Sequence, residues 1–448
     1  MMWYGRSPMA PKIFFFLLIL PSFLFTGFYR TSSAATAETK PSRENAPYSE
    51  RSAEALPERI TMKQALDMLK RKSRRTEATK SRVDIAAADR ITARAYPNPT
   101  FEYSGLALAL GATLDAVWEH QFILEQPILL FGQRGARKQL ADANVLATQA
   151  QVALDLKKRT RAVRKAFVTL LAHQKRLELL KRSSQDLDRI LKIVRGRSSA
   201  GDQSLYEVAR IELEIETHRL EIERTRTDLE DASGKLSALL GMPGYRPSAE
   251  GNLSPVSIPS NKTELWQKAS ANHPAIMAAQ AHRSVAESKL RVARRERLPT
   301  PSFVMGINQT QDERSTSVVF GFSIPLPIFD RGKGDIARAN ATIKAESKAL
   351  EAEQLEIRAE INRAHSVYIR QLATLQRMEE KMLKRLPELR RMAEKSYSET
   401  GSSFLDLLDA FRTIKNLELL YLKQREAVKK AEVTLISAAA LELVFRAR

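Results

Sequence analysis

The 448-residue chain carries 72 Lys and Arg against 52 Asp and Glu, a formal charge of +20, and no cysteine. The lack of cysteine excludes disulfides, thiolate metal sites and cysteine nucleophiles. The basic surplus is spread among many acids and forms no compact module with interleaved aromatic residues, so nucleic acid is not an expected partner.

The N-terminal residues 1–37 have the pattern of a secretory signal peptide. Basic residues precede an apolar run over 13–28, and small residues follow as far as Ala37. The run is interrupted by proline and glycine and is short for a membrane anchor, so we expect cleavage near Ala37. Without a cysteine the mature chain is not a lipoprotein. We expect residues 38–58 to form a flexible segment.

Short sequences recur along the chain at a spacing near 200 residues. The recurring positions keep the same order and lie 202, 198 and 200 residues apart: Pro97 with Pro299, Pro127 with Pro325, and Gly201 with Gly401. We therefore expect a tandem duplication. The first repeat covers 59–241, a linker covers 242–262, and the second repeat covers 263–448.

Each repeat is predicted to begin with a helix and continue with two strands. The first helix starts near Thr61 and ends before Pro97, because the residue ahead of a proline is disfavoured in a helix. Apolar and polar residues then alternate with a period of two. The predicted strands cover about 99–110, 116–127, 302–310 and 315–326.

The alternating segments suggest strands that cross an outer membrane. Such strands place an apolar face toward lipid and a polar face toward a lumen over about ten residues. Two soluble hairpins packed on helices are the alternative. Glycine and serine on the polar face favour the barrel.

Long helices are predicted to follow the strands. Apolar residues recur in steps of three, four or seven from Leu156 to Val194 and from Leu350 to Met392, a pattern typical of a coiled-coil seam. Each helix has about 60 residues and a length of roughly 90 Å. A tight turn comes next, and a second helix then runs back alongside the first. Such narrow seams need neighbouring helices to cover them.

Four strands per chain also leave two sheet edges with unpaired backbone groups. Hydrocarbon does not tolerate such edges. We therefore expect copies of the chain to close one sheet together.

The mature chain resembles the TolC family of outer-membrane efflux channels over essentially its whole length. The resemblance lies in the duplicated plan, the strand exit at 126–132, the repeat end at 238–241 and the Gly-x-x-x-Leu hairpin turns. The stretch 324–332 is most similar to the heavy-metal branch, the CzcC-like and CusC-like channels.

This resemblance implies an α+β membrane protein. Three chains would share a twelve-stranded barrel in the outer membrane, and their helices would form a coiled-coil tube in the periplasm. The homotrimer would be a passive duct, supplied by a periplasmic adaptor protein and an inner-membrane pump, with heavy-metal cations as the expected cargo. The alternatives are a multidrug, organic-solute or protein export channel of the same fold, and an exported coiled-coil scaffold that forms no channel.

No enzymatic activity or cofactor is expected. The sequence contains no phosphate-binding loop or dinucleotide fingerprint, and its six histidines show no metal-ligand spacing. A duct need not bind tightly what it passes, so metal export does not require metal ligands.

By resemblance, Asp406 and Asp409 line the closed periplasmic gate. Three residues apart on a helix, they share one face, and in a trimer they would form rings of carboxylates. The alternative for Asp406 is a capping box with Ser403. The first repeat has Tyr206 and Ala209 at the matching positions, so it lacks this acidic turn.

The hairpin turns are, by the same resemblance, the sites where the adaptor docks. The alternative is that their glycines only terminate helices. The expected contact residues are Gly201, Asp202, Gln203, Ser204, Leu205, Gly401, Ser402, Ser403, Phe404 and Leu405.

Basic residues crowd the junctions between strands and helices. In the proposed topology they lie at the membrane surface, so we expect them to contact anionic lipid headgroups. Ordinary solvated helix ends are the alternative. The expected anchors are Arg134, Arg137, Arg291, Arg294, Arg295, Arg297 and Arg331.

Overall fold

The computed structural model describes residues 56–109, 116–199, 205–259, 261–310, 315–399 and 403–441. The chain divides into the units Met1–Ala55 and Leu56–Arg448, and all described residues belong to the second. The expected signal peptide and cleavage site lie outside the described residues.

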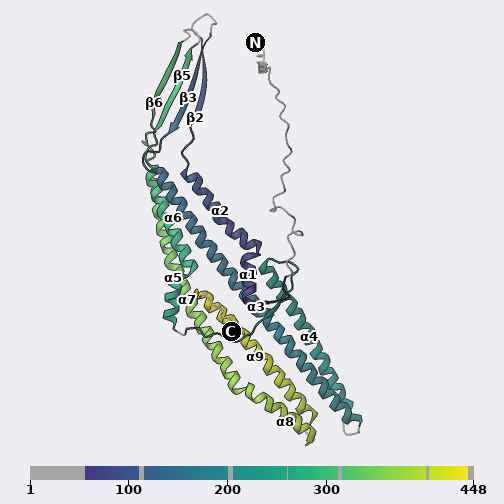
Figure 1. Ribbon diagram of the computed structural model, residues 1–448. Coiled ribbons are helices and arrows are strands. Elements are labelled where there is room, and N and C mark those ends of the chain that lie inside the picture. Colours follow the sequence, from purple (N-terminus) through teal and green to yellow (C-terminus); the bar gives the residue numbers. More distant parts are fainter. Residues whose placement is uncertain are drawn as a thin grey trace, which may run out of the picture. The chain divides into compact units, whose positions relative to one another are not determined.

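The second unit repeats one order of elements. Its first half contains β1 (Arg59–Thr61), α1 (Met62–Arg71), α2 (Arg74–Arg94), β2 (Thr100–Ala109), β3 (Ala116–Pro127), α3 (Gln133–Ser199) and α4 (Leu205–Leu240). Its second half contains β4 (Ser248–Glu250), α5 (Lys262–Asn272), α6 (Pro274–Glu296), β5 (Ser302–Thr310), β6 (Ser315–Ser323), α7 (Lys333–Lys381), α8 (Leu386–Glu399) and α9 (Phe404–Ala438). In this unit the strands β2, β3, β5 and β6 lie at one end. The beginning of α4, the end of α8 and the beginning of α9 lie at the other (Figure 1).

The four longer strands form one antiparallel sheet in the order β2-β3-β5-β6. The register of the sheet places the apolar positions of neighbouring strands directly opposite one another. Phe122 pairs with both Tyr103 and Ile307, and Met305 pairs with Phe320. Because directly paired residues share a face, the apolar residues gather on one side of the sheet.

That apolar face is open to solvent. Phe101 is 67% exposed and Phe320 is 78% exposed. The other face is polar, with Ser104 donating to Gln121 at 3.3 Å and the amide of Asn308 donating to Glu119. A contiguous exposed apolar surface is unusual for a soluble protein.

Left-handed glycines connect the sheet to the long helices. Gly132 precedes α3 with φ 77°, and Gly332 precedes α7 with φ 67°. A Cβ at Gly332 would lie 2.8 Å from the Cβ of Arg297. Both turns therefore require a residue without a side chain.

The long helix of the second half is not continuous, contrary to expectation. α3 runs unbroken for 67 residues, whereas α7 ends at Lys381 and a 3-10 turn over Leu383–Arg385 leads into α8. Pro387 has no N–H to donate to a carbonyl one turn earlier, so the regular hydrogen bonding fails there. The expected seam also ends early, since Met392 is exposed.

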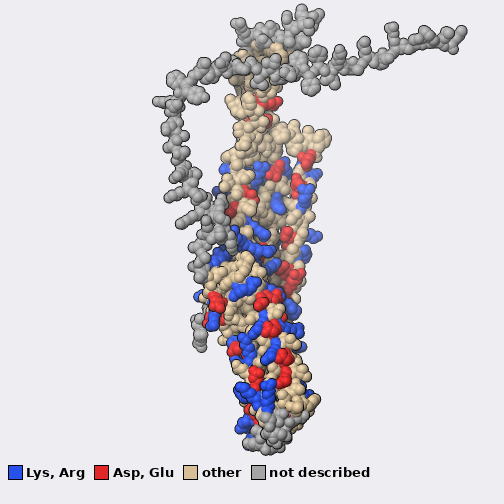
Figure 2. Space-filling view, turned by 90° about the vertical axis from the view of Figure 1, so that its right-hand side faces the viewer, with Lys and Arg blue, Asp and Glu red and all other residues tan. Residues whose placement is uncertain are grey.

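A short parallel pairing of β1 with β4, which the periodicity did not predict, joins the start of the first half to the start of the second. β4 lies within the expected linker 242–262. On the face in Figure 2, charged side chains are dense along the helices and sparse over the visible strand end. Among the described residues, no helix combines the length and the hydropathy of a membrane span.

Candidate functional site

The two aspartates expected at a gate lie at the beginning of α9. Ser403 caps this helix, and its Oγ accepts a hydrogen bond from the N–H of Leu405 at 3.1 Å. Asp406 lies in the first turn, where a carboxylate interacts favourably with the helix dipole. Asp406 and Asp409 are both exposed, so solvent reaches both carboxylates.

The alternative role of Asp406, a capping box, needs a second bond from the N–H of Ser403 to the carboxylate. At α1 both bonds are present, with Thr61 and Gln64 joined at 3.3 and 2.8 Å. At α9 the described side-chain bond of the cap is the one that Ser403 Oγ accepts from the N–H of Leu405. Ser403 therefore caps the helix without the carboxylate of Asp406.

The opposite side of the same two turns is buried. Phe404, Leu407 and Leu408 join an apolar cluster with residues of α3, α4 and α8. The ring of Phe404 lies edge-on to that of Tyr397 in α8, 6.5 Å between centroids. This packing fixes the rotation of α9 and leaves the two aspartates on its exposed side.

Among the expected adaptor-contact residues that the structure describes, some are exposed and one is buried. Leu205, at the start of α4, is 81% exposed, whereas Phe404 is 1% exposed and belongs to the core. Ser403 and Leu405 are exposed. The remaining expected contacts lie outside the described residues: Gly201, Asp202, Gln203, Ser204, Gly401 and Ser402.

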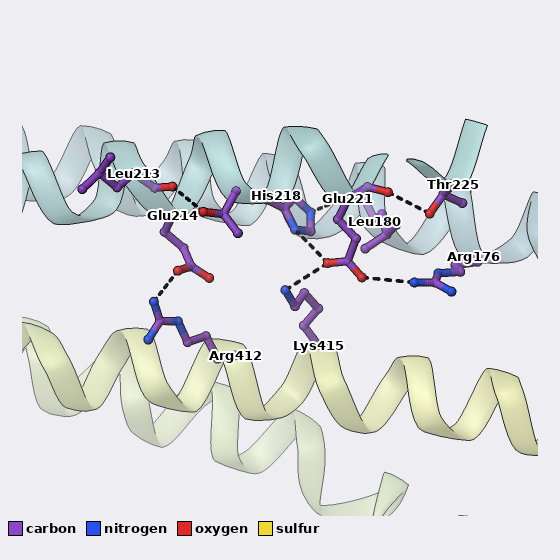
Figure 3. Close-up of polar contacts among 10 residues, drawn as sticks. Arg176, Leu180, Leu213, Glu214, His218, Glu221, Thr225, Arg412 and Lys415 are labelled. Atoms are coloured by element: carbon purple, nitrogen blue, oxygen red, sulfur yellow. Dashed lines mark hydrogen bonds and ion pairs between the residues drawn. The ribbon is translucent and has the colours of Figure 1, made fainter. Parts of the chain in front are cut away.

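Two ion pairs join α4 of the first half to α9 of the second (Figure 3). The guanidinium of Arg412 donates to the carboxylate of Glu214. Lys415 Nζ lies 3.3 Å from Glu221, which also accepts from Arg176 of α3 at 3.3 Å. Glu221 therefore connects three helices.

These contacts shift the pKa values of Glu214 and Arg412, the ion pair nearer to the beginnings of α4 and α9. The hydrogen bond from Arg412 lowers the pKa of Glu214. The same bond raises the pKa of Arg412, and the negative charge of Asp409 adds to that rise. Asp409 is thus electrostatically coupled to the link between the two hairpins.

A buried histidine lies beside this link (Figure 3). His218 Nε2 is 2.8 Å from the carbonyl oxygen of Leu180, so this bond joins α4 to α3. Its Nδ1 lies 4.0 Å from Glu221. Across the described ranges, no group of three or more His, Asp or Glu is placed to hold a metal ion.

At the sheet end, some of the expected anchors already have partners within the chain. Arg134 Nε donates to the carbonyl of Arg94 at 2.6 Å, and its guanidinium lies 4.3 Å from the ring centroid of Tyr96. Arg137 pairs with Glu296 at 2.9 Å.

Four of the other expected anchors, Arg291, Arg294 and Arg295 of α6 and Arg297 at its C-cap, line one cavity. It has a volume of about 690 Å³ and lies between α3, α6 and the start of α7. Arg291 donates to Ser288 at 2.7 Å. Arg294, Arg295 and Arg297 form no ion pair with any described residue, and neither does Arg331 of the neighbouring turn.

The chain matches the family model described as outer membrane efflux protein over residues 65–242 and 265–441. It is 26% identical to the cobalt-zinc-cadmium resistance protein CzcC of Cupriavidus metallidurans, covering 81% of this chain and 86% of that protein. It is 24% identical to the nickel-cobalt-cadmium resistance protein NccC of Alcaligenes xylosoxydans, covering 72% of each. A crystal structure of CusC superposes with a TM-score of 0.71 at 19% identity, covering 84% of this chain and 91% of that one.

Proposed function

Because this chain belongs to the outer membrane efflux protein family, we propose that it forms the outer-membrane duct of a tripartite pump that exports heavy-metal cations. Its strands would lie in the outer membrane and its helices in the periplasm. A periplasmic adaptor and an inner-membrane pump would supply cargo and energy.

The exposed apolar face of the sheet carries this proposal. Four strands with one aromatic-rich face match the lipid-facing surface of an outer-membrane barrel. β2 and β6 are the outer strands of the sheet, so each has one edge unpaired within the chain. A homotrimer would pair β6 of one copy with β2 of the next and remove every edge.

Extraction and conductance test the duct directly. We expect the protein to leave membranes only in detergent, and the purified protein to form steady conductances in a planar bilayer. Extraction in salt alone, without conductance, would support the exported scaffold and contradict the duct.

Two relatives support cations as the cargo. CzcC and NccC are described as resistance proteins for cobalt, zinc and cadmium and for nickel, cobalt and cadmium. Cells lacking the chain should accumulate these metals, and restoring it should reverse the accumulation. If only an organic dye accumulates, the chain serves multidrug export instead.

For the gate, we propose that Asp406 and Asp409 from three copies form carboxylate rings at the periplasmic entrance. Their exposure beside a buried apolar cluster supports this role. Replacing both by Asn removes the negative rings, so divalent-cation block of the conductance should weaken. Glu212, an exposed acid of α4, provides the control. Unchanged block in the double variant contradicts the gate.

The hairpin turns at 201–205 and 401–405 are the proposed docking sites for the adaptor. The exposure of Leu205 and Leu405 supports them, whereas Phe404 acts through packing. Photo-crosslinkers at Leu205 and Leu405 should capture the adaptor in cells. A crosslinker at Leu220, exposed midway along α4, should not.

Anionic lipid is the proposed partner of the arginines around the 690 Å³ cavity. Arg294, Arg295 and Arg297 are stronger candidates than Arg134 and Arg137, which already have partners. Replacing these three and Arg291 by Gln should lower affinity for phosphatidylglycerol vesicles, at about 1 kcal/mol per residue. Unchanged affinity would contradict the anchoring role.

A further inference from the structure

Midway along α3, basic side chains surround a small cavity. It has a volume of about 250 Å³ and lies between α3, the junction of α5 with α6, and the end of α9. Lys157, Arg161 and Arg164 line it from α3, together with Asn272 and Ser437. The wall therefore offers several hydrogen-bond donors and a surplus of positive charge.

Two of these donors have no partner. Lys157 Nζ and Arg164 Nε are buried and make no hydrogen bond with any described residue. Glu360 of α7 lies nearby, but its carboxylate accepts from Arg161 at 2.9 Å. Leaving a buried cation unpaired costs free energy, so such groups point to an anionic ligand.

The surroundings shift the pKa values of Lys157 and His273, and the beginning of α6 adds positive potential. Burial lowers the pKa of Lys157 to about 8, against the attraction of Glu360, and Arg161 lowers it further. Burial and the charge of Lys157 also lower the pKa of His273 to about 4, so this residue is neutral near pH 7. Pro274 lines the cavity at the start of α6, whose N-terminal end carries partial positive charge.

We propose that this cavity binds a small oxyanion of the phosphate class, with the Lys157 ammonium and the Arg164 guanidinium as its donors. A phosphate oxyanion offers several acceptors to converging cationic donors. The site is independent of the proposed cargo and gate.

The geometry favours a free anion over a lipid headgroup as the ligand of this cavity. α6 extends 23 residues from the cavity toward the strands, about 34 Å. A membrane that surrounds the sheet would not bring its headgroups that far along the helices.

Calorimetric titration of inorganic phosphate into the detergent-solubilised full chain tests the proposal. At constant ionic strength and neutral pH we expect one saturable site per chain. Lys157→Met and Arg164→Met should each weaken binding at least about tenfold, because each removes a charge-assisted hydrogen bond. Lys158→Met, at the exposed neighbouring position, should change it less than about twofold.

A pH series separates binding from a purely structural role. Wild-type affinity should fall as the pH rises through about 8, where Lys157 loses its proton while Arg161 and Arg164 keep their charges. Lys157→Arg should retain binding above that pH. Lys157→Met should unfold at the same temperature as wild type or higher, because it replaces a buried unpaired ammonium by an apolar group.

Three results would overturn the proposal. The first is the absence of saturable binding to wild type at millimolar phosphate, and the second is equal affinity in wild type and both methionine variants. Displacement of bound phosphate by short-chain phosphatidylglycerol is the third, because it would assign the cavity to lipid.

Discussion

The two helical hairpins share an order of elements but differ in how their tips are held. The first combines the unbroken α3 with α4, which begins at the exposed Leu205. The second is broken between α7 and α8, and its α9 begins with the buried Phe404. The start of α9 therefore packs against the first hairpin, and the exposed acids Asp406 and Asp409 lie beside this packed surface. The same order of elements thus leaves the start of one returning helix exposed and buries the start of the other.

The largest predicted contrast lies between the first residues of α4 and α9. Phe404→Ala should lower the free energy of unfolding by about 3–5 kcal/mol, because it removes a fully buried ring. Leu205→Ala should change it by less than about 0.5 kcal/mol. Chemical denaturation of the purified protein measures both changes. Equal losses of unfolding free energy in the two variants would contradict the difference between the two helix beginnings.

A smaller effect should follow from breaking the link between the hairpins. Arg412→Met should cost roughly 0.5–1.5 kcal/mol, since the pair with Glu214 is only partly shielded from solvent. A double-mutant cycle with Glu214→Gln isolates the pair. Arg219→Met, which breaks an exposed pair within α4, is the control and should cost less than about 0.5 kcal/mol. A zero coupling energy for Arg412 and Glu214 would mean that the tips are held by packing alone.

The pH dependence of this link should be smaller still. The pKa of Glu214 is lowered from 4.5, so its contribution to stability is complete above that pH and disappears as the pH falls through the lowered value. The stability difference between wild type and Arg412→Met should be constant near neutral pH and shrink in acid. A difference that grows in acid would show that another group dominates.

The strands could be located from sequence because their signal is local. Alternation between neighbouring residues marks each strand and its faces, and β6 ends at Ser323, three residues before the expected end. The pairing of β3 with β5 could not be found in this way, because Phe122 and Ile307 are joined only by the folded chain. The break after α7 was missed because the apolar spacing continues past it, although Pro387 was a visible warning.

The candidate site at the beginning of α9 could be predicted only in part from the sequence. Asp406 and Asp409 stand out as acids in an otherwise apolar turn. The neighbouring link between Glu214 and Arg412 joins residues 198 apart, so no local pattern reveals it. Opposite charges at matching positions of α4 and α9 were the available signal. Lys157, whose Nζ is buried, could not be distinguished by sequence from the exposed Lys158 beside it.

Closure of the sheet between copies is the central claim, and cross-linking of its edges tests it most directly. The chain has no cysteine, so a pair can be introduced without background: Ser104→Cys on β2 with Ser317→Cys, Val319→Cys or Gly321→Cys in turn on β6. We predict that oxidation in membranes gives a ladder of linked chains that ends at three copies for at least one pair. Monomers alone for every pair, or a ladder that continues beyond three, would contradict a closed trimeric pore.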